Sequence, residues 1–260
     1  MGYRRAAGQG WLTFRRILAF LALVAASAVG LESSVAVPPE CGRLDYVDNR
    51  YTICVVDLRV SELRLFSRDD AGDPFVSFRA VDDALAAVGA TLSFAMNGGM
   101  FDNDYAPIGL FIEDGETLVA ANTNEGPGNF HLLPNGVFYW AGDTAGIMET
   151  NRFVQEAPPA EFATQSGPML LIDGEVHPRF LPDSESRKIR NGVGILDEHR
   201  VVFVLSENSV TFYEFALLFR DRLGVRDALF LDGSVSEMYV PSLNRSGLGW
   251  FGPIIGVVER

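Results

Sequence analysis

Four short turn sequences in the middle of the chain each have apolar or β-branched residues on both sides. Turns of this kind need a left-handed backbone, and the two strands that flank such a turn pair antiparallel. The sequence therefore predicts four hairpins, with structural roles in the turns for Asp114, Asn135 and Asp173. The hairpins span residues 109–120 around Asp114-Gly115, 130–140 around Asn135-Gly136, 169–177 around Asp173-Gly174, and 193–205 around residues 197–200.

Two further segments share a different order, namely a helix, a glycine, a buried strand and a polar turn. The first has a helix over 75–88 with Phe78, Val81, Leu85 and Val88 on one face, then Gly89, a strand over 91–96 and Asn97-Gly98-Gly99. The second has a capping box of Thr211 and Glu214, a helical face of Phe212, Phe215, Phe219 and Leu223, then Gly224, a strand over 228–231 and Asp232-Gly233-Ser234. A polar residue directly after a buried strand lies at the rim of a sheet, where α/β folds build their sites.

These patterns together predict the fold class. No linker rich in Pro, Gly or Ser divides the chain, so we expect one domain over residues 29–260. The expected fold is α+β, with a mixed, hairpin-rich sheet flanked by a few helices.

The first 28 residues resemble a secretory signal peptide. Their positive charges, Arg4, Arg5, Arg15 and Arg16, precede or begin an apolar run over 17–29, and Ala26-Ser27-Ala28 is a small-x-small cleavage site. We expect cleavage after residue 28, a periplasmic or secreted protein and no membrane span in the mature chain. An uncleaved N-terminal anchor is the alternative.

The charge of the chain limits its partners. Four of the 21 basic residues lie in the expected signal peptide, which leaves 17 against 34 acidic residues in the mature chain. Such an acidic domain repels nucleic acid, so we expect no nucleic-acid partner. An anionic substrate must instead meet a local cluster of hydrogen-bond donors.

The two cysteines indicate a disulfide and no metal site. Cys41 and Cys54 have twelve residues between them, and in an exported chain they are expected to pair. Two separately buried thiols are the alternative. Without CxxC spacing, and with His131, His177 and His199 scattered, the sequence predicts neither a metal nor another cofactor.

Common catalytic motifs are missing from the sequence. Ser166 lies in Thr164-Gln165-Ser166-Gly167-Pro168, which lacks the first glycine of a nucleophile elbow and has a proline where that elbow needs a helix. The chain also has no GxGxxG motif, Walker loop or HExxH motif. A serine hydrolase is therefore not expected.

Polar residues next to glycines are the remaining candidates for a site. Asn97-Gly98-Gly99 and Gln165-Ser166-Gly167 offer backbone N–H groups that can bind an anion. Arg187, Lys188, Arg190 and Asn191-Gly192 form the densest basic stretch of the mature chain, and a guanidinium matches two phosphate oxygens. His177 ends a strand before Pro178 and is a further candidate for substrate contact.

In their order along the chain, these motifs resemble the exported bacterial members of the phosphodiester glycosidase family. The resemblance covers about residue 45 to the C-terminus. The motifs are Asn97-Gly98-Gly99-Met100-Phe101, Pro107-Ile108-Gly109-Leu110, Asn129-Phe130 with Pro134-Asn135-Gly136-Val137-Phe138, Gln165-Ser166-Gly167-Pro168-Met169-Leu170, Arg190-Asn191-Gly192-Val193-Gly194 and Leu231-Asp232-Gly233-Ser234-Val235-Ser236. Animal-type members carry Asp-Gly-Gly-Gly-Ser at the last motif, so Asp232 and Ser236 align with it but the residues between them do not.

The resemblance implies a hydrolase that cleaves the glycosidic C1–O bond of a sugar-1-phosphate diester, in a small molecule or a glycan. Because the leaving group is a weakly basic phosphate monoester, an anion clamp and a carboxylate beside the sugar are the main needs. Asp232 is the expected carboxylate, and Glu237 or Asp102 takes the second role. The expected substrate-binding residues are Asn97, Gly98, Gly99, Ser166, Gly167, His177, Arg190, Asn191 and Ser236.

Two other functions stay open at this point. One is a non-catalytic carbohydrate-binding module that uses the aromatic faces of Trp140, Tyr239 and Trp250. The other is a phosphodiesterase that cuts the P–O bond, which usually needs a metal cluster.

Overall fold

The computed structural model describes residues 38–232 and 235–260. The expected signal peptide, residues 1–28, lies outside the described residues, as do Gly233 and Ser234. Residues Ser34–Arg260 group into one compact unit. Within the described part of the chain, no helix combines the length and apolarity that crossing a membrane would need.

The largest sheet has seven strands in the order β1-β2-β13-β12-β14-β10-β11. Every neighbouring pair in it is antiparallel. Its strands are β1 (Glu40–Tyr46), β2 (Asn49–Asp57), β13 (Arg200–Ser206), β12 (Asn191–Ile195), β14 (Ala228–Phe230), β10 (Met169–Ile172) and β11 (Glu175–Val176). One side of this sheet packs against α3 (Phe212–Leu217), which continues into the π-helix η1 (Leu218–Arg222).

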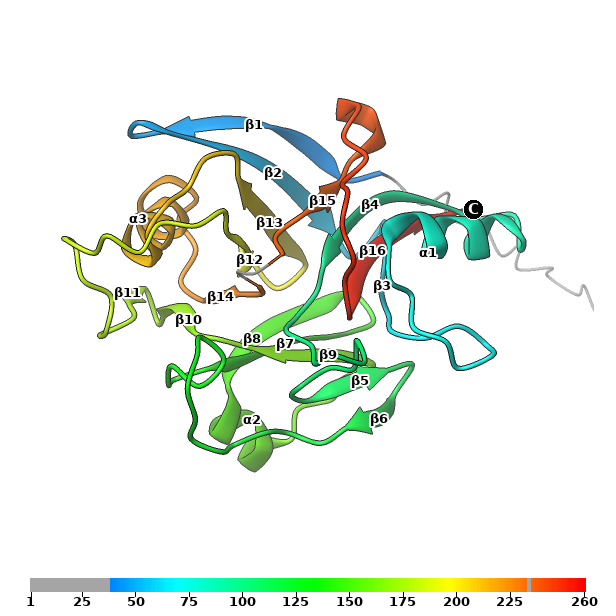
Figure 1. Ribbon diagram of the computed structural model, residues 1–260, viewed down its shortest axis with the longest axis horizontal. Coiled ribbons are helices and arrows are strands. Elements are labelled where there is room, and N and C mark those ends of the chain that lie inside the picture. The colour runs from blue at the N-terminus through cyan, green and yellow to red at the C-terminus, as the bar shows by residue number, and fades with distance from the viewer. Residues whose placement is uncertain (1–37, 233–234) are drawn as a thin grey trace, which may run out of the picture. The chain divides into compact units, whose positions relative to one another are not determined.

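Two smaller sheets, both antiparallel, complete the fold (Figure 1). The four-stranded sheet has the order β15 (Met238–Tyr239), β4 (Thr91–Asn97), β16 (Ile254–Glu259) and β3 (Glu62–Phe66). The five-stranded sheet has the order β6 (Glu116–Val119), β5 (Phe111–Glu113), β9 (Phe162–Ser166), β7 (Gly136–Ala141) and β8 (Thr144–Glu149). The remaining helices are α1 (Phe78–Ala86), α2 (Thr150–Glu156) and the 3-10 turn η2 (Pro241–Leu243).

The main hydrophobic core lies where the three sheets face one another. Phe94 of β4, Phe138 of β7 and Phe203 of β13 come from different sheets, and Phe203 is 5.0 Å from Phe94 and 6.0 Å from Phe138 between ring centroids. All three side chains are fully buried. Each sheet therefore covers its apolar face with the other two, and the strand ends around this core are fixed relative to one another.

The α+β class with a few helices is confirmed, but the sheet architecture differs from the expectation. In place of one mixed sheet, the chain forms three sheets with antiparallel neighbours. The physical reason is that most strands are joined by short hairpin turns, which permit only antiparallel pairing, whereas parallel neighbours need long crossovers.

Three of the four expected hairpins are confirmed, namely β5–β6, β10–β11 and β12–β13. Asp114 and Asp173 have the positive φ that their turns require. The hairpin around Asn135-Gly136 is wrong, because β7 begins at Gly136 and pairs with β8 through a turn at Gly142. Asn135 is buried and donates its side-chain amide to the carbonyl of Phe130 at 2.9 Å, so it stabilises the chain that precedes β7.

Both expected helices form, with small differences at their ends. Ser77 caps α1, and the capping box of Thr211 and Glu214 begins α3 as expected. Val88 lies beyond the last helical residue and is 76% exposed, so it is not part of the buried face that Phe78, Val81 and Leu85 form.

A disulfide joins β1 to β2, as the sequence predicts. Cys41 and Cys54 are directly opposite each other in the β1–β2 register and bond at an S–S distance of 2.05 Å. Because β1 is an edge strand near the beginning of the described chain, the bond holds it on the sheet. Closure of so short a loop stabilises the fold by about 3 kcal/mol in the chain-entropy description.

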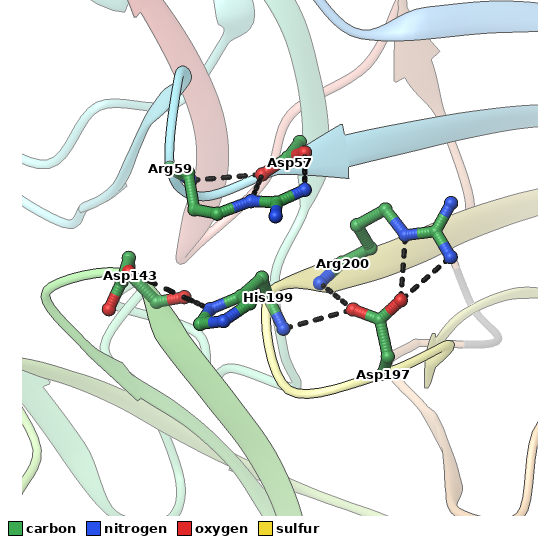
Figure 2. A network of polar contacts seen from close by, with 6 residues as sticks. All are labelled: Asp57, Arg59, Asp143, Asp197, His199 and Arg200. Carbon is green, nitrogen blue, oxygen red and sulfur yellow. Dashed lines mark hydrogen bonds and ion pairs between the residues drawn. The ribbon is translucent and has the colours of Figure 1, made fainter.

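His199 belongs to a charged network at two hairpin turns, which Figure 2 shows. Its Nδ1 lies 2.8 Å from the carbonyl oxygen of Asp143 in the β7–β8 turn. Asp197 accepts hydrogen bonds from the backbone N–H groups of His199 and Arg200. Nearby, the hydrogen bond from the Arg59 side chain lowers the pKa of Asp57 to about 2. The network joins the turns of two sheets, so the contacts of His199 support the fold.

Candidate functional site

The candidate site lies where strand ends from all three sheets converge (Figure 1). Asn97 ends β4 and Glu237 precedes β15, both in the four-stranded sheet. Asn191 begins β12 and Asp232 follows β14, both in the seven-stranded sheet, while Ser166 ends β9 of the five-stranded sheet. Residues that are far apart in the sequence are therefore brought together by the packing of the sheets.

Two buried asparagines hold the centre of this site. Asn191 donates its side-chain amide to the backbone carbonyl of Asn97 at 3.0 Å and to its Oδ1 at 2.8 Å. The amide of Asn97 in turn donates to the carbonyl of Val235 at 2.6 Å. Both side chains are fully buried, and a buried amide must find such partners to avoid a desolvation penalty. The pair thus fixes β4, β12 and the segment after β14 in one geometry.

Asp232 lies within this asparagine network and is only 5% exposed. Its backbone N–H donates to Oδ1 of Asn191 at 2.9 Å, and its Oδ2 is 3.4 Å from Nδ2 of Asn97. Ser236 donates its hydroxyl to the carbonyl of Asp232 at 2.5 Å and is 3.5 Å from Oδ1 of Asn191. The backbone of Asp232 is therefore held through both its N–H and its carbonyl, and the Asn97 amide faces its carboxylate, as expected for a group that must meet a substrate in one orientation.

Glu237 is attached to the same network through its backbone. Its N–H donates to Oδ1 of Asn97 at 3.0 Å, so one asparagine contacts both acidic residues. Burial raises the pKa of the Glu237 carboxyl, and Arg245 acts against this shift. The guanidinium of Arg245 is 3.7 Å from the Glu237 carboxylate and 2.7 Å from that of Glu207.

Sequence reasoning missed Arg245 and Thr164. Arg245 lies in a loop, and no sequence motif marks it. The elements β15 and η2, which precede it in the chain, bring it beside Glu207 and Glu237. Thr164 donates its hydroxyl to the carbonyl of Gly98 at 2.8 Å. It lies two residues before Ser166 on β9, so strand alternation puts both side chains on one face, and this was the available sequence signal.

The glycines after Asn97 allow close packing with neighbouring strands. The N–H of Gly98 donates to the carbonyl of Pro253 at 2.7 Å, so this donor is used within the protein. A Cβ on Gly98 would come within 2.5 Å of Ile255, and one on Gly99 within 2.8 Å of the Thr164 hydroxyl. The expected anion nest therefore lacks the Gly98 donor, and both positions exclude larger residues.

Ser166 and Gly167 support the site from β9. Ser166 is fully buried and donates its hydroxyl to the carbonyl of Leu231 at 2.6 Å, which fixes the residue before Asp232. A Cβ on Gly167 would approach the side chain of Asn135 to 2.6 Å. Ser166 thus supports the Asp232 segment, and Gly167 allows close packing against the chain that precedes β7.

Arg190 is buried beside the site and binds backbone carbonyls with part of its guanidinium. Nε donates to Val210 and Nη2 to Ser186, both at 3.0 Å, and Cζ stands 3.6 Å above the Phe212 ring centroid. Within the described part of the chain, Nη1 is buried and has no hydrogen-bond partner. No carboxylate of the described residues forms an ion pair with this guanidinium, and burial lowers its pKa to about 10.

Arg190 precedes β12 and Asp232 comes shortly after β14, at the same end of this strand pair. The β12–β14 register ends at Gly192 opposite Phe230, two residues from each of them. The guanidinium of Arg190 packs toward Phe230, with Cζ 5.5 Å from the ring centroid, whereas the carboxylate of Asp232 faces Asn97. The two residues therefore flank the same strand ends.

The stacked rings of Phe180 and Phe212 lie between His177 and the guanidinium of Arg190. The His177 ring stacks on Phe180 at 4.7 Å, and Phe180 stacks on Phe212 at 4.9 Å. Burial lowers the pKa of His177, and its Nε2 has no hydrogen-bond partner among the described residues. Two phenylalanine rings separate it from Arg190, so the structure does not join His177 to the asparagine network.

Asp102 also lies outside the network. It is exposed, and its Oδ1 accepts hydrogen bonds from the N–H groups of Asp104 and Ala106 at 2.9 and 3.0 Å. These bonds stabilise the turn after Phe101. Of the three acidic residues that the sequence suggested, the structure brings Asp232 and Glu237 together and leaves Asp102 at a turn.

The described residues contain no cluster of three or more His, Cys, Asp or Glu side chains with the geometry to hold a metal ion. The side-chain donors described around Asp232 are the Asn97 amide and the Ser236 hydroxyl. Such a set can bind an anion and can stabilise or use a carboxylate.

Comparisons with known proteins agree with these features. A sequence profile described as phosphodiester glycosidase matches residues 90–251, a range that contains Asn97, Asn191, Asp232 and Glu237. The uncharacterized protein YigE of Escherichia coli K12 is 36% identical over 242 residues, which are 92% of this chain and 91% of YigE.

Two solved structures are similar to this chain at low sequence identity. The zebrafish N-acetylglucosamine-1-phosphodiester alpha-N-acetylglucosaminidase catalytic domain, auto-inhibited by its pro-peptide, has a TM-score of 0.59 at 14% identity and covers 88% of this chain and 85% of its own. A candidate exported protein of Burkholderia pseudomallei has a TM-score of 0.53 at 12% identity, over 80% and 74% of the two chains. At these identities the two structures show a shared fold.

Proposed function

This chain belongs to the phosphodiester glycosidase family, and from that premise we propose that it hydrolyses the glycosidic C1–O bond of a sugar-1-phosphate diester. The observation that carries this proposal is the placement of Asp232, with an amide donor beside its carboxylate and with its backbone bound to Asn191, the residue after the buried Arg190. A carboxylate next to the sugar and a cation next to the phosphate are the two groups that this reaction needs.

The proposed reaction divides these roles between the two groups. As the C1–O bond breaks, its electron pair goes to the bridging oxygen, and the phosphate leaves as a monoester while positive charge develops at C1. Asp232 stabilises that charge, either as a nucleophile or as the base that takes a proton from the attacking water. The uncommitted Nη1 of Arg190 neutralises the phosphate oxygens.

Glu237 is proposed as the second carboxyl group. Its raised pKa keeps a larger fraction protonated near neutral pH than an ordinary glutamate would have, which suits a proton donor. The need for this proton is small, because a phosphate monoester is already a good leaving group. Asp102 is the weaker candidate for the role, since both its partners belong to its own turn.

Product analysis in oxygen-18 water tests the proposed reaction. Incubation with a panel of nucleotide sugars and sugar phosphodiesters is expected to place the label on C1 of the released sugar, because water attacks C1 either directly or in the hydrolysis of a glycosyl-enzyme ester. Label in the phosphate would instead identify a phosphodiesterase. A folded protein with no turnover on the panel would favour the carbohydrate-binding alternative.

Export is also proposed, with residues 1–28 as a cleaved signal peptide and a periplasmic or secreted domain over 29–260. The Cys41–Cys54 disulfide supports this location, since such bonds persist in oxidising compartments, and the similar Burkholderia protein is a candidate exported protein. N-terminal sequencing of protein from the periplasmic fraction is expected to begin near Val29. Intact Met1 in a cytoplasmic fraction would contradict both parts of the proposal.

A further inference from the structure

The loop between η2 and β16 contains two exposed apolar side chains. Leu248 is 82% exposed and Trp250 is 71% exposed, in the sequence Ser246-Gly247-Leu248-Gly249-Trp250. A tryptophan has the largest apolar face of any residue, and leaving it in water is unfavourable unless something covers it. Trp140, by comparison, is buried and donates its indole N–H to the carbonyl of Leu63 at 3.0 Å.

This loop is fixed along the border of the candidate site. At its beginning, Arg245 lies 3.7 Å from the carboxylate of Glu237. At its end, the carbonyl of Pro253 accepts the N–H of Gly98 at 2.7 Å. Between these points, Gly249 packs against Val235, because a Cβ there would be 3.4 Å from the valine side chain. Each of these contacts involves a segment of the asparagine network, so Trp250 is exposed next to the candidate site.

The loop is also anchored at both ends by backbone hydrogen bonds and a buried ring. The neighbour of Trp250, Phe251, is fully buried, stacks on Phe78 at 4.5 Å and donates its N–H to the carbonyl of Val76 at 3.0 Å. Val240 and Arg245 exchange backbone hydrogen bonds at the base of the loop. An anchored backbone with an exposed ring loses little conformational entropy when a ligand covers the ring.

A cavity of about 460 Å³ adjoins the loop on the side of α1. Residues 246–249, which directly precede Trp250 in the chain, form one wall, and the other walls carry the Tyr239 ring and the hydroxyl, carboxylate and guanidinium groups of Ser77, Asp82 and Arg79. Apolar rings beside hydrogen-bonding side chains are the combination that binds a sugar ring, whose faces are apolar and whose edges are polar. The volume is within the range of small-ligand pockets.

We propose that Trp250 and this cavity form an accessory subsite that binds a second sugar of the substrate, beyond the sugar whose C1 reacts. The inference rests on the proposed function and names the substrate class more narrowly, as a phosphodiester whose aglycone or sugar part is a glycan. The acidic charge of the chain disfavours an anionic membrane surface as the partner of Trp250.

Binding can be measured without turnover, by tryptophan fluorescence of the full chain. Titration with a neutral trisaccharide panel (chitotriose, mannotriose and maltotriose) is expected to give a saturable change with at least one sugar. The Trp250→Phe variant should lose this signal, because Trp140 is buried and the third tryptophan, Trp11, lies in the expected signal peptide. Because this readout needs no catalysis, glycan binding by a protein that hydrolyses no phosphodiester would refute the proposed function and leave the subsite standing.

A kinetic comparison tests the same subsite with two substrates. Trp250→Ala is expected to raise KM about tenfold for a diester with a trisaccharide aglycone and to leave KM for the matching methyl diester unchanged, since ring stacking contributes roughly that factor. Val88→Ala is the control, because Val88 is similarly exposed and does not line the cavity. Equal KM changes for both substrates, no saturable fluorescence change with any sugar, or Trp250-dependent binding to phosphatidylcholine vesicles without a sugar response would overturn the proposal.

Discussion

Asp232→Asn is expected to lower kcat by between about 10² and 10⁴-fold and to leave KM within a few-fold of wild type. The carboxylate acts on the positive charge that develops at C1 only as the bond breaks, so its loss raises the barrier more than it weakens the ground-state complex. Steady-state kinetics on the best diester of the oxygen-18 panel measure both constants.

The surroundings of Asp232 make this substitution a clean test. Asparagine keeps the backbone N–H that donates to Asn191 and an oxygen that can face Nδ2 of Asn97, so the fold is expected to be retained. Asp114→Asn is the control, since that exposed aspartate has φ +49° in a hairpin turn and asparagine accepts such a backbone. If a folded Asp232→Asn protein turns over within a few-fold of wild type, Glu237 becomes the leading catalytic carboxyl.

The sequence predicted local structure best where one short segment determines it. The turn pairs at Asp114 and Asp173 and the capping box of Thr211 and Glu214 depend on residues only a few positions apart, and all formed as expected. Asn135-Gly136 has the same turn signature but does not form a hairpin turn. There, Gly136 is needed because a Cβ would be 2.9 Å from Met169, a contact that no local pattern encodes.

The candidate site shows the same division between local and long-range information. Asp232 and Asn97 were predicted as site residues because each follows a buried strand, a local signal. Their hydrogen bonds through Asn191, and the approach of Arg245 to Glu237, connect residues from different sheets. Those contacts depend on how three apolar sheet faces pack together, and the expectation of one sheet could not place them. Asp102 illustrates the converse, since a glycine-rich context suggested chemistry where the carboxylate stabilises its own turn.

Arg190→Lys is expected to raise KM for the phosphodiester at least about tenfold and to lower the free energy of unfolding by about 1–3 kcal/mol. In the wild type, Nε and Nη2 are held by the carbonyls of Val210 and Ser186, and the planar group lies on Phe212. Nη1 is the donor left for a phosphate oxygen. A lysine ammonium has the charge but one nitrogen, so it cannot satisfy both carbonyls and the substrate together.

Two measurements separate the structural part of this effect from the binding part. Urea denaturation gives the change in stability, and KM, with the inhibition constant of inorganic phosphate, gives the change in anion binding at a temperature where both proteins are folded. Arg187→Lys is the matched control from the same basic stretch, because that arginine is half-exposed and pairs with Glu214 at the surface. A variant that is less stable but binds phosphate and substrate as wild type does would show that Arg190 only supports the fold, and the anion clamp would then have to be sought among backbone donors near Asn97. A parallel rise in KM and in the phosphate inhibition constant, absent in Arg187→Lys, would identify the buried guanidinium as the group that holds the leaving phosphate.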